Sequence, residues 1–137
     1  MIVVSACLAG IECRYNGSAF PVAQVAEMVR KGRAIPLCPE LLAGLPSPRP
    51  PVEQHNGKII SIDGTDHTEQ YAAGAKIGME IALASRCRKA ILKSKSPTCG
   101  SGFVYDGTFS GILIPGDGIF TKLLREKGIE VCSEESF

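Results

Sequence analysis

The chain has 137 residues, of which 45% are hydrophobic and 21% are charged, and its formal net charge is +1. This length is enough for one hydrophobic core, so we expect residues 1–137 to form a single compact domain. The small net charge argues against duplex nucleic acid as a partner, and the longest apolar run is too short to span a membrane.

The first half of the chain predicts two short strands, a helix and a long loop. No basic residue precedes the β-branched run at 2–6, so this run is a first strand rather than a signal peptide, and we expect a cytoplasmic protein. Pro21 and Gly32 bound a predicted helix, and 34–38 form a second strand. Five prolines follow between positions 39 and 51, and they predict a stiff loop over 39–54 that contains no helix.

The second half of the chain alternates strands with helices. The predicted segments are, in order, a strand or hairpin arm at 58–62, a helix at 69–88, a strand at 89–94, a hairpin or irregular extended segment at 102–114, a helix at 118–128 and a strand at 129–133. Asp66 or Thr68 caps the long helix, and the hairpin turns at Asp106 and Gly107. The pattern predicts an α/β fold in which a mostly parallel sheet is covered by helices on both faces, in a Rossmann-like arrangement of three layers.

Six cysteines stand out in a chain of this kind. A reducing cytoplasm keeps thiols free, so these cysteines are candidates for metal binding or catalysis rather than for disulfides. Cys7, Cys38 and Cys99 each follow a predicted strand, and the carboxyl ends of parallel strands meet at one edge of the sheet. We therefore expect the three thiols to share a site, which Cys13, in the loop after Cys7, could also reach.

For the remaining two cysteines we predict a packing role. Cys87 lies near the end of the long predicted helix, and Cys132 lies within the last predicted strand. Neither has a special loop setting, and a free cysteine is readily buried as a small hydrophobic residue. We expect both to pack in the core.

Three converging thiolates are compatible with three chemistries. Structural zinc usually takes four ligands and often local C-x-x-C pairs, and this sequence contains no such pair. A phosphatase loop needs C-x5-R after the first strand, but Arg14 lies one residue too far from Cys7. An iron–sulfur cluster suits thiolates, and three ligands would leave one iron open to act as a Lewis acid. Spacing alone does not separate a cluster from zinc.

Four sequence blocks carry a resemblance to a known family. They are SACLAGIECRYNG, LCPELLAGLPSPR, AILKSKSPTCGSG and YDGTFSG, and they extend over nearly the whole chain. In this order they resemble the YbbK-like domain family, which includes thiouracil desulfidase. The resemblance implies an enzyme with a [4Fe-4S] cluster held by three cysteines. In such an enzyme the free iron takes the sulfur of a thiolated pyrimidine or a related small thio-compound, without net redox change.

The same resemblance implies roles for particular residues. Matched onto this sequence, the cluster ligands would be Cys7, Cys38 and Cys99, with Cys13 as an alternative to Cys38. Glu40 and Ser96 would be the catalytic pair. Glu40 would deprotonate the attacking water, and Ser96 would donate to the ring or relay a proton.

Simpler roles stay open for several of these residues. Glu40 could cap a local turn, and Ser96 could form the turn before Pro97. Arg49 lies between two prolines and either binds an anionic part of a substrate or holds the loop in place. For the whole protein, the alternative is a non-catalytic chain that stores, senses or binds through a cysteine-bound metal.

Overall fold

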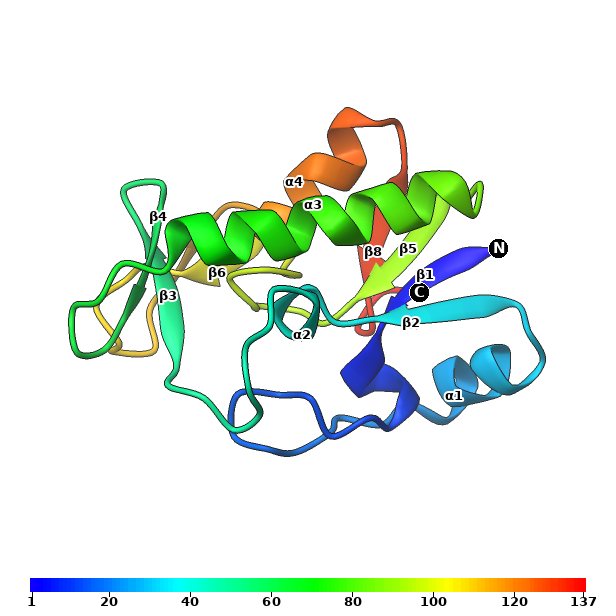
Figure 1. Ribbon diagram of the computed structural model, residues 1–137, viewed down its shortest axis with the longest axis horizontal. Helices are drawn as coiled ribbons and strands as arrows, with labels where there is room; N and C mark the ends of the chain where they lie inside the picture. The colour runs from blue at the N-terminus through cyan, green and yellow to red at the C-terminus, as the bar shows by residue number, and fades with distance from the viewer.

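A four-stranded parallel sheet forms the centre of the computed structural model, which describes residues 1–137 (Figure 1). Its strands are β1 (Ile2–Ser5), β2 (Ala34–Leu37), β5 (Lys89–Leu92) and β8 (Glu130–Ser133), in the order β2-β1-β5-β8. Ile2 at the start of β1 pairs with Ala34 on one side and with Lys89 on the other. The strand order reverses between β1 and β5, which is the point where ligands of open α/β sheets usually bind.

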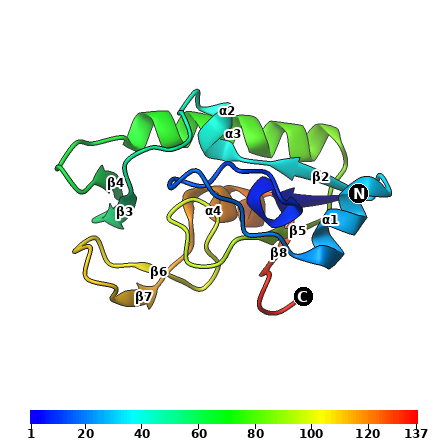
Figure 2. The same ribbon diagram turned by 90° about the horizontal axis from the view of Figure 1, so that it is seen from below.

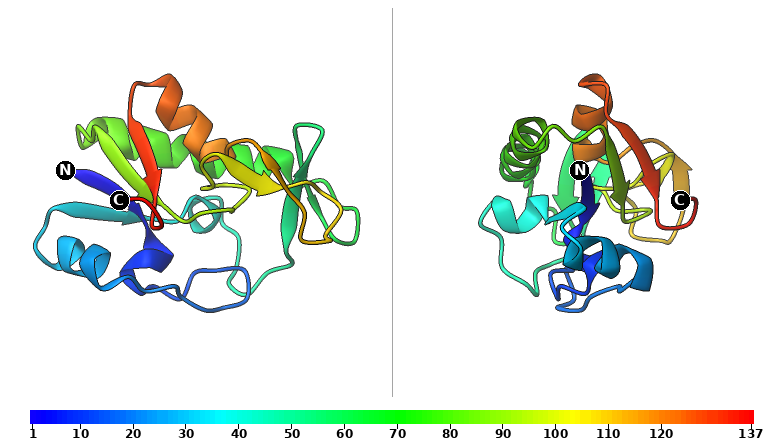
Figure 3. Two further views of the ribbon diagram at one scale, coloured as in Figure 1. Left: turned by 180° about the vertical axis from the view of Figure 1, so that it is seen from behind. Right: turned by 90° about the vertical axis from the view of Figure 1, so that its right-hand side faces the viewer.

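Helices cover both faces of this sheet (Figure 3). The helix α1 (Ala23–Arg30) lies on one face, while α3 (Thr68–Ala84) and α4 (Ile119–Glu126) lie on the other. Successive residues of β1 point to opposite faces, so Val3 packs in the core under α3 and α4 and Val4 packs in the core under α1. The predicted α/β architecture with helices on both faces is confirmed.

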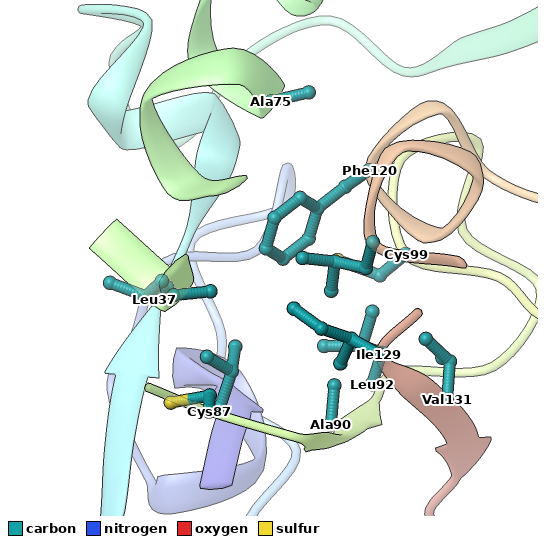
Figure 4. Close-up of a cluster of buried hydrophobic side chains, with 12 residues drawn as sticks. Leu37, Ala75, Cys87, Ala90, Leu92, Cys99, Phe120, Ile129 and Val131 are labelled. Atoms are coloured by element: carbon teal, nitrogen blue, oxygen red, sulfur yellow. The ribbon is translucent and has the colours of Figure 1, made fainter. Parts of the chain in front are cut away.

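The larger core gathers around the ring of Phe120 on α4 (Figure 4). Phe120 is fully buried, and its neighbours in this cluster include Leu92 of β5 and Ala75 of α3. Cys87 packs in the same cluster, as expected, although it follows the long helix because α3 ends at Ala84 rather than at residue 88. Cys132 is half-buried against the α1 core, where its thiol faces the carbonyl of Ala90 at 3.7 Å.

A short helix, α2 (Pro39–Leu42), occupies the start of the proline-rich segment, so the prediction that this segment excludes a helix was wrong. Proline is tolerated in the first turn of a helix, where its missing N–H has no intrahelical partner to lose, and Pro39 stands there. The helix packs closely on α3 at Gly74. A Cβ at Gly74 would overlap the Pro39 carbonyl and lie 2.8 Å from the Cβ of Ala43.

Two hairpins lie together beyond the carboxyl ends of the central strands (Figures 1 and 2). One pairs β3 (Val52–His55) with β4 (Lys58–Ser61), so 58–61 is a hairpin arm and the predicted loop ends earlier than expected. The other pairs β6 (Phe103–Tyr105) with β7 (Leu113–Pro115), which confirms a hairpin at 102–114. Its connection runs over 106–112 instead of turning tightly at residues 106 and 107.

Side chains of β3 hold the two hairpins against the rest of the fold. The Glu53 carboxylate accepts hydrogen bonds from the backbone N–H groups of Gly107 at 3.0 Å and Phe109 at 3.1 Å. The Gln54 amide donates to the carbonyl oxygens of Pro97 at 2.8 Å and Asp117 at 2.9 Å. These hydrogen bonds hold the hairpins in place at the carboxyl end of the sheet. None of the helices combines the length and apolar composition that a membrane span requires.

Candidate functional site

A cavity of about 390 Å³ lies at the carboxyl end of the central sheet. Three of its walls come from the carboxyl ends of strands and the residues just beyond them: 5–7 at β1, 37–40 at β2, and 93–97 with Cys99 at β5. The side of β3 closes it through Val52 and Glu53. This volume is within the range of small-molecule sites.

Four thiols line this cavity. Cys7 lies in a short 3-10 helix, Ala6–Ala9, that directly follows β1, so its setting is helical rather than a loop. Cys38 directly precedes α2, and Cys13 and Cys99 come from the loops after Ala9 and after β5. Cys7, Cys13 and Cys99 are buried and Cys38 is half-buried. None of them is in a disulfide.

Cys13 lies between two of the other thiols. The Cys38 thiol faces the Cys13 carbonyl at 4.0 Å, and both Cys7 and Cys38 influence the pKa of the Cys13 thiol. Hydrogen bonding with Cys38 lowers the pKa of Cys13, but hydrogen bonding with Cys7 and burial outweigh it and raise the pKa to about 11. The structure therefore places Cys13, the alternative ligand, in the same cavity as the three thiols singled out from the sequence.

The thiols of Cys38 and Cys99 also favour their protonated form. Hydrogen bonding with Cys13, followed by burial, raises the pKa of Cys38, and burial raises the pKa of Cys99. Burial disfavours a thiolate unless a cation compensates its charge. A bound metal centre supplies that compensation and takes the proton's place on sulfur.

The donors suit a cluster better than a single ion. No three side chains of His, Cys, Asp or Glu are arranged so that they could hold one metal ion. In an iron–sulfur cluster each cysteine binds a separate iron, so thiols spread around a cavity are the required arrangement. Soft sulfur donors in a cavity of this size therefore fit a [4Fe-4S] group.

Glu40 reaches the cavity from the first turn of α2, two residues after Cys38. Its Oε2 accepts a hydrogen bond from Nη2 of Arg49 at 2.6 Å. Its Oε1 accepts one long hydrogen bond, from the Thr98 hydroxyl at 3.5 Å. One carboxylate oxygen is thus firmly bonded and the other is available to a group in the cavity.

Ser96 has a structural role in the loop that carries Cys99. Its Oγ accepts hydrogen bonds from the backbone N–H groups of Thr98 at 3.1 Å and Cys99 at 3.0 Å, as expected for a residue that forms a turn. These bonds occupy the oxygen but leave the hydroxyl hydrogen free for donation, and Ser96 lines the cavity. Position 100 favours glycine, because a Cβ there would lie 2.6 Å from the Ser96 carbonyl oxygen.

Two residues that sequence reasoning missed also line the cavity. Lys93 directly follows β5, where its ammonium lies 3.0 Å from Glu134 Oε2 and 4.4 Å from the centre of the Phe20 ring. Tyr71 of α3 is buried, and burial raises the pKa of its phenol. The position of Lys93 at a strand's carboxyl end was a usable signal, whereas nothing in the helical pattern marks Tyr71.

Comparisons with known proteins agree with this geometry. A family model described as 2-thiouracil desulfurase matches residues 2–136. The uncharacterized protein YbbK of Bacillus subtilis (strain 168) is 44% identical over 144 residues, covering 98% of this chain and 95% of YbbK. The solved structure of thiouracil desulfidase TudS, described as [4Fe-4S]-dependent, matches with a TM-score of 0.94 and 40% identity over 99% of this chain and 91% of that one. The chain is therefore a member of the 2-thiouracil desulfurase family, the YbbK-like family that its sequence blocks resemble.

Proposed function

We propose that this protein is an iron–sulfur-dependent desulfidase that removes sulfur from a thiolated pyrimidine or a related thio-compound without net redox change. The observation that carries the proposal is the meeting of four thiols, Glu40 and Ser96 around one cavity. The likeness to TudS, which is described as a [4Fe-4S]-dependent thiouracil desulfidase, supports it. The free thiols suit a reducing cytoplasm, which we propose as the location.

The proposed ligands are Cys7, Cys38 and Cys99, one from the end of each of three central strands. Together they would hold a [4Fe-4S] cluster and leave one iron without a protein ligand. When bound, such a cluster supplies a soft Lewis acid that binds a thione sulfur in preference to a carbonyl oxygen. Cys13 is the alternative third ligand because it lines the same cavity and its carbonyl faces the Cys38 thiol.

The proposed reaction exchanges sulfur for oxygen at one carbon. The oxygen of a water molecule forms a bond to the thiocarbonyl carbon, the carbon–sulfur bond breaks, and the products are a carbonyl compound and hydrogen sulfide. Both protons of the water end on sulfur, so no oxidant or reductant is required.

Glu40 and Ser96 supply the proton transfers in this scheme. The free Oε1 of Glu40 takes the proton from the attacking water, because Oε2 is occupied by Arg49. Ser96 offers its hydroxyl hydrogen to the substrate ring while its oxygen holds the backbone of the Cys99 turn. Positioned acid–base groups of this kind typically contribute about 10²–10⁴-fold to a rate.

Anaerobic cluster reconstitution followed by a sulfide-release assay tests the function. We expect the reconstituted protein to release sulfide from at least one of a set of thiouracils, thionucleosides and thionucleotides. A protein that holds a stable cluster but releases sulfide from none of them would favour the alternative of a non-catalytic metal-binding or sensing protein. Cys132→Ser is the matched control, because Cys132 lies outside the cavity.

A further inference from the structure

The side chain of Arg49 joins three segments around the cavity and is only 2% exposed. Its Nη2 donates to Glu40 Oε2 at 2.6 Å and to the Cys13 carbonyl at 2.8 Å. Its Nη1 donates to the Pro46 carbonyl at 3.1 Å, and its backbone N–H donates to the Tyr15 carbonyl at 2.7 Å. Arg49 therefore connects α2, the loop that carries Cys13, and the proline-rich loop.

Arg49 stands behind the cavity and not in its wall. Glu40 and Cys13 both line the cavity, but Arg49 does not. Because the guanidinium is buried and already bonded to Glu40, Cys13 and Pro46, Arg49 fits the second role that its sequence position suggested, holding the loop in place, better than binding an anionic part of a substrate. Any influence on the reaction has to pass through the groups that it holds.

The hydrogen bonds of Arg49 make the two oxygens of Glu40 unequal. A planar guanidinium fixes a carboxylate in direction as well as in position, which a lysine ammonium cannot do. With Oε2 fixed by Nη2, the carboxylate presents Oε1 to the cavity in one orientation. The same Nη2 holds the Cys13 carbonyl, so the Cys13 loop and the carboxylate share one anchor.

Fold stability alone does not account for this arginine. Its Nε is buried and has no hydrogen-bond partner, which is a cost to the folded state. A buried ion pair can often be replaced by hydrophobic residues of similar volume with no loss of stability. An ion pair that leaves a donor unsatisfied beside a reactive cavity is better explained by what it does for Glu40.

We propose that Arg49 is the positioning residue of this site: it holds Glu40 so that Oε1 faces the substrate, and it fixes the Cys13 loop to the same carboxylate. The proposal rests on the proposed desulfidase function for its effect on rate. The contact itself can be tested without turnover.

The first test is a double-mutant cycle between R49K and E40Q. Single-turnover sulfide release, normalised to iron bound per chain, should fall about 10²-fold in R49K, because displacing a catalytic group by about 1 Å can cost that much. In the E40Q background, R49K should cause little further loss in rate per bound iron, because the effect of Arg49 on the reaction rate passes through Glu40, whereas any effect through the Cys13 loop would appear in the iron content. An R49K that turns over at the parent rate, or that keeps its full effect on top of E40Q, would overturn the proposal.

The second test reads the carboxylate directly. An infrared difference spectrum between the parent and E40Q isolates the carboxylate bands of Glu40, and we expect these bands to shift in R49K because the ion pair is altered. R125K is the matched control, since Arg125 pairs with Asp117 on the surface at 2.8 Å, and it should leave both the bands and the rate unchanged.

The two tests give separate answers on the role of Arg49 and on the desulfidase function. Glu40 bands that are the same in the parent and in R49K would overturn the role of Arg49 whether or not any thio-compound is turned over. A parent protein that carries a cluster but desulfurates nothing would disprove the desulfidase function, while the infrared bands would still decide whether Arg49 holds Glu40. Thermal unfolding of R49K, recorded alongside, identifies any variant whose loss of rate reflects unfolding.

Discussion

The hydroxyl oxygen of Ser96 accepts the backbone N–H of Cys99 at 3.0 Å, so the proposed proton donor also shapes the turn that presents a proposed cluster ligand. Removing the hydroxyl should therefore affect two properties at once. It leaves the N–H groups of Thr98 and Cys99 without their acceptor, and it removes the hydrogen offered to the substrate.

We expect Ser96→Ala to lower the free energy of unfolding by about 1 kcal/mol and also to lower the rate per cluster. Ser96→Thr keeps the hydroxyl and should restore most of both. The measurements are chemical unfolding, iron content and single-turnover sulfide release. A Ser96→Ala protein that loses stability but keeps the parent rate per cluster would reduce Ser96 to a turn former.

Replacing Glu40 by glutamine tests the proposed base. Glutamine keeps the size of the side chain and can still accept from Arg49, but it cannot take a proton from water near neutral pH. We expect cluster content close to that of the parent and a single-turnover rate lower by about 10²–10⁴-fold. If Glu40→Gln turns over like the parent with its cluster intact, Glu40 is only a structural carboxylate.

Serine substitutions sort the cysteines by their role in cluster binding. Oxygen is a poor replacement for a soft thiolate ligand, so Cys7→Ser, Cys38→Ser and Cys99→Ser should each abolish cluster binding. Iron and acid-labile sulfide, measured per chain after anaerobic reconstitution, report the result. Cys13→Ser decides the open alternative, because a lost cluster there together with a retained cluster in Cys38→Ser would make Cys13 the third ligand.

The controls for the cysteine series lie in the cores of the same domain. Cys87→Ser and Cys132→Ser should keep nearly the full cluster content, because neither residue lines the cavity. Cys87→Ser buries a hydroxyl among apolar side chains and should lower stability by about 1–3 kcal/mol. Equal cluster loss across the whole series would remove the support for a distinct ligand group.

Gly74→Ala tests how the site depends on the packing of α2 against α3. The added methyl group would overlap the Pro39 carbonyl, so α2, which carries Glu40 and begins next to Cys38, has to move away from α3. We expect a loss of about 1–3 kcal/mol in unfolding free energy and a lower rate per cluster, measured by chemical unfolding and single turnover. Ala73→Ser, on the exposed face of the same helix, should change stability by no more than about 0.5 kcal/mol.

Glu134 should make the stability of the fold depend on acid. Its carboxylate bonds the Lys93 ammonium and the N–H and hydroxyl of Ser94. Burial raises the pKa of Glu134, but these bonds outweigh burial and hold the pKa below its usual value. The resulting stabilisation is fully present above the unfolded pKa of about 4.3 and is lost as the pH falls through the lower folded pKa.

The free energy of unfolding of the parent and of Glu134→Gln should therefore differ by about 1–3 kcal/mol near neutral pH and converge in acid. Denaturant titrations from about pH 7 to about pH 3 measure the difference. Glu135→Gln, at the exposed neighbouring position, should stay within about 0.5 kcal/mol of the parent near neutral pH. A difference between the parent and Glu134→Gln that is constant with pH would show that the charge of Glu134 plays no part.

The fold and the gathering of thiols could be predicted because both follow from local patterns. Cys7 and Cys38 come directly after short β-branched or apolar runs, and parallel strands bring such positions to one edge. The helix at Pro39 could not be recognised in the same way. A count of prolines marks the segment as non-helical, although a proline at the first helical position is compatible with a helix.

The layer behind the site was not predictable from sequence. Arg49 reaches Glu40 and Cys13 because the proline-rich loop folds back on the loop after Ala9, and no periodic pattern encodes such a path. Tyr71 likewise lines the cavity from α3, which packs closely on α2 at Gly74. Contacts of this kind depend on how loops and helices pack in three dimensions, which spacing along the chain does not reveal.

The position of β5 between β1 and β8 affects when the site can form during synthesis. The N-terminal part of a chain leaves the ribosome first, so β1 and β2 are free to pair while the third central strand is still being made. Cys99 follows that strand and is therefore the last of the four thiols to emerge. We expect cofactor insertion to wait until Cys99 has emerged, and ribosome-arrested chains that end before residue 99 should acquire no cluster.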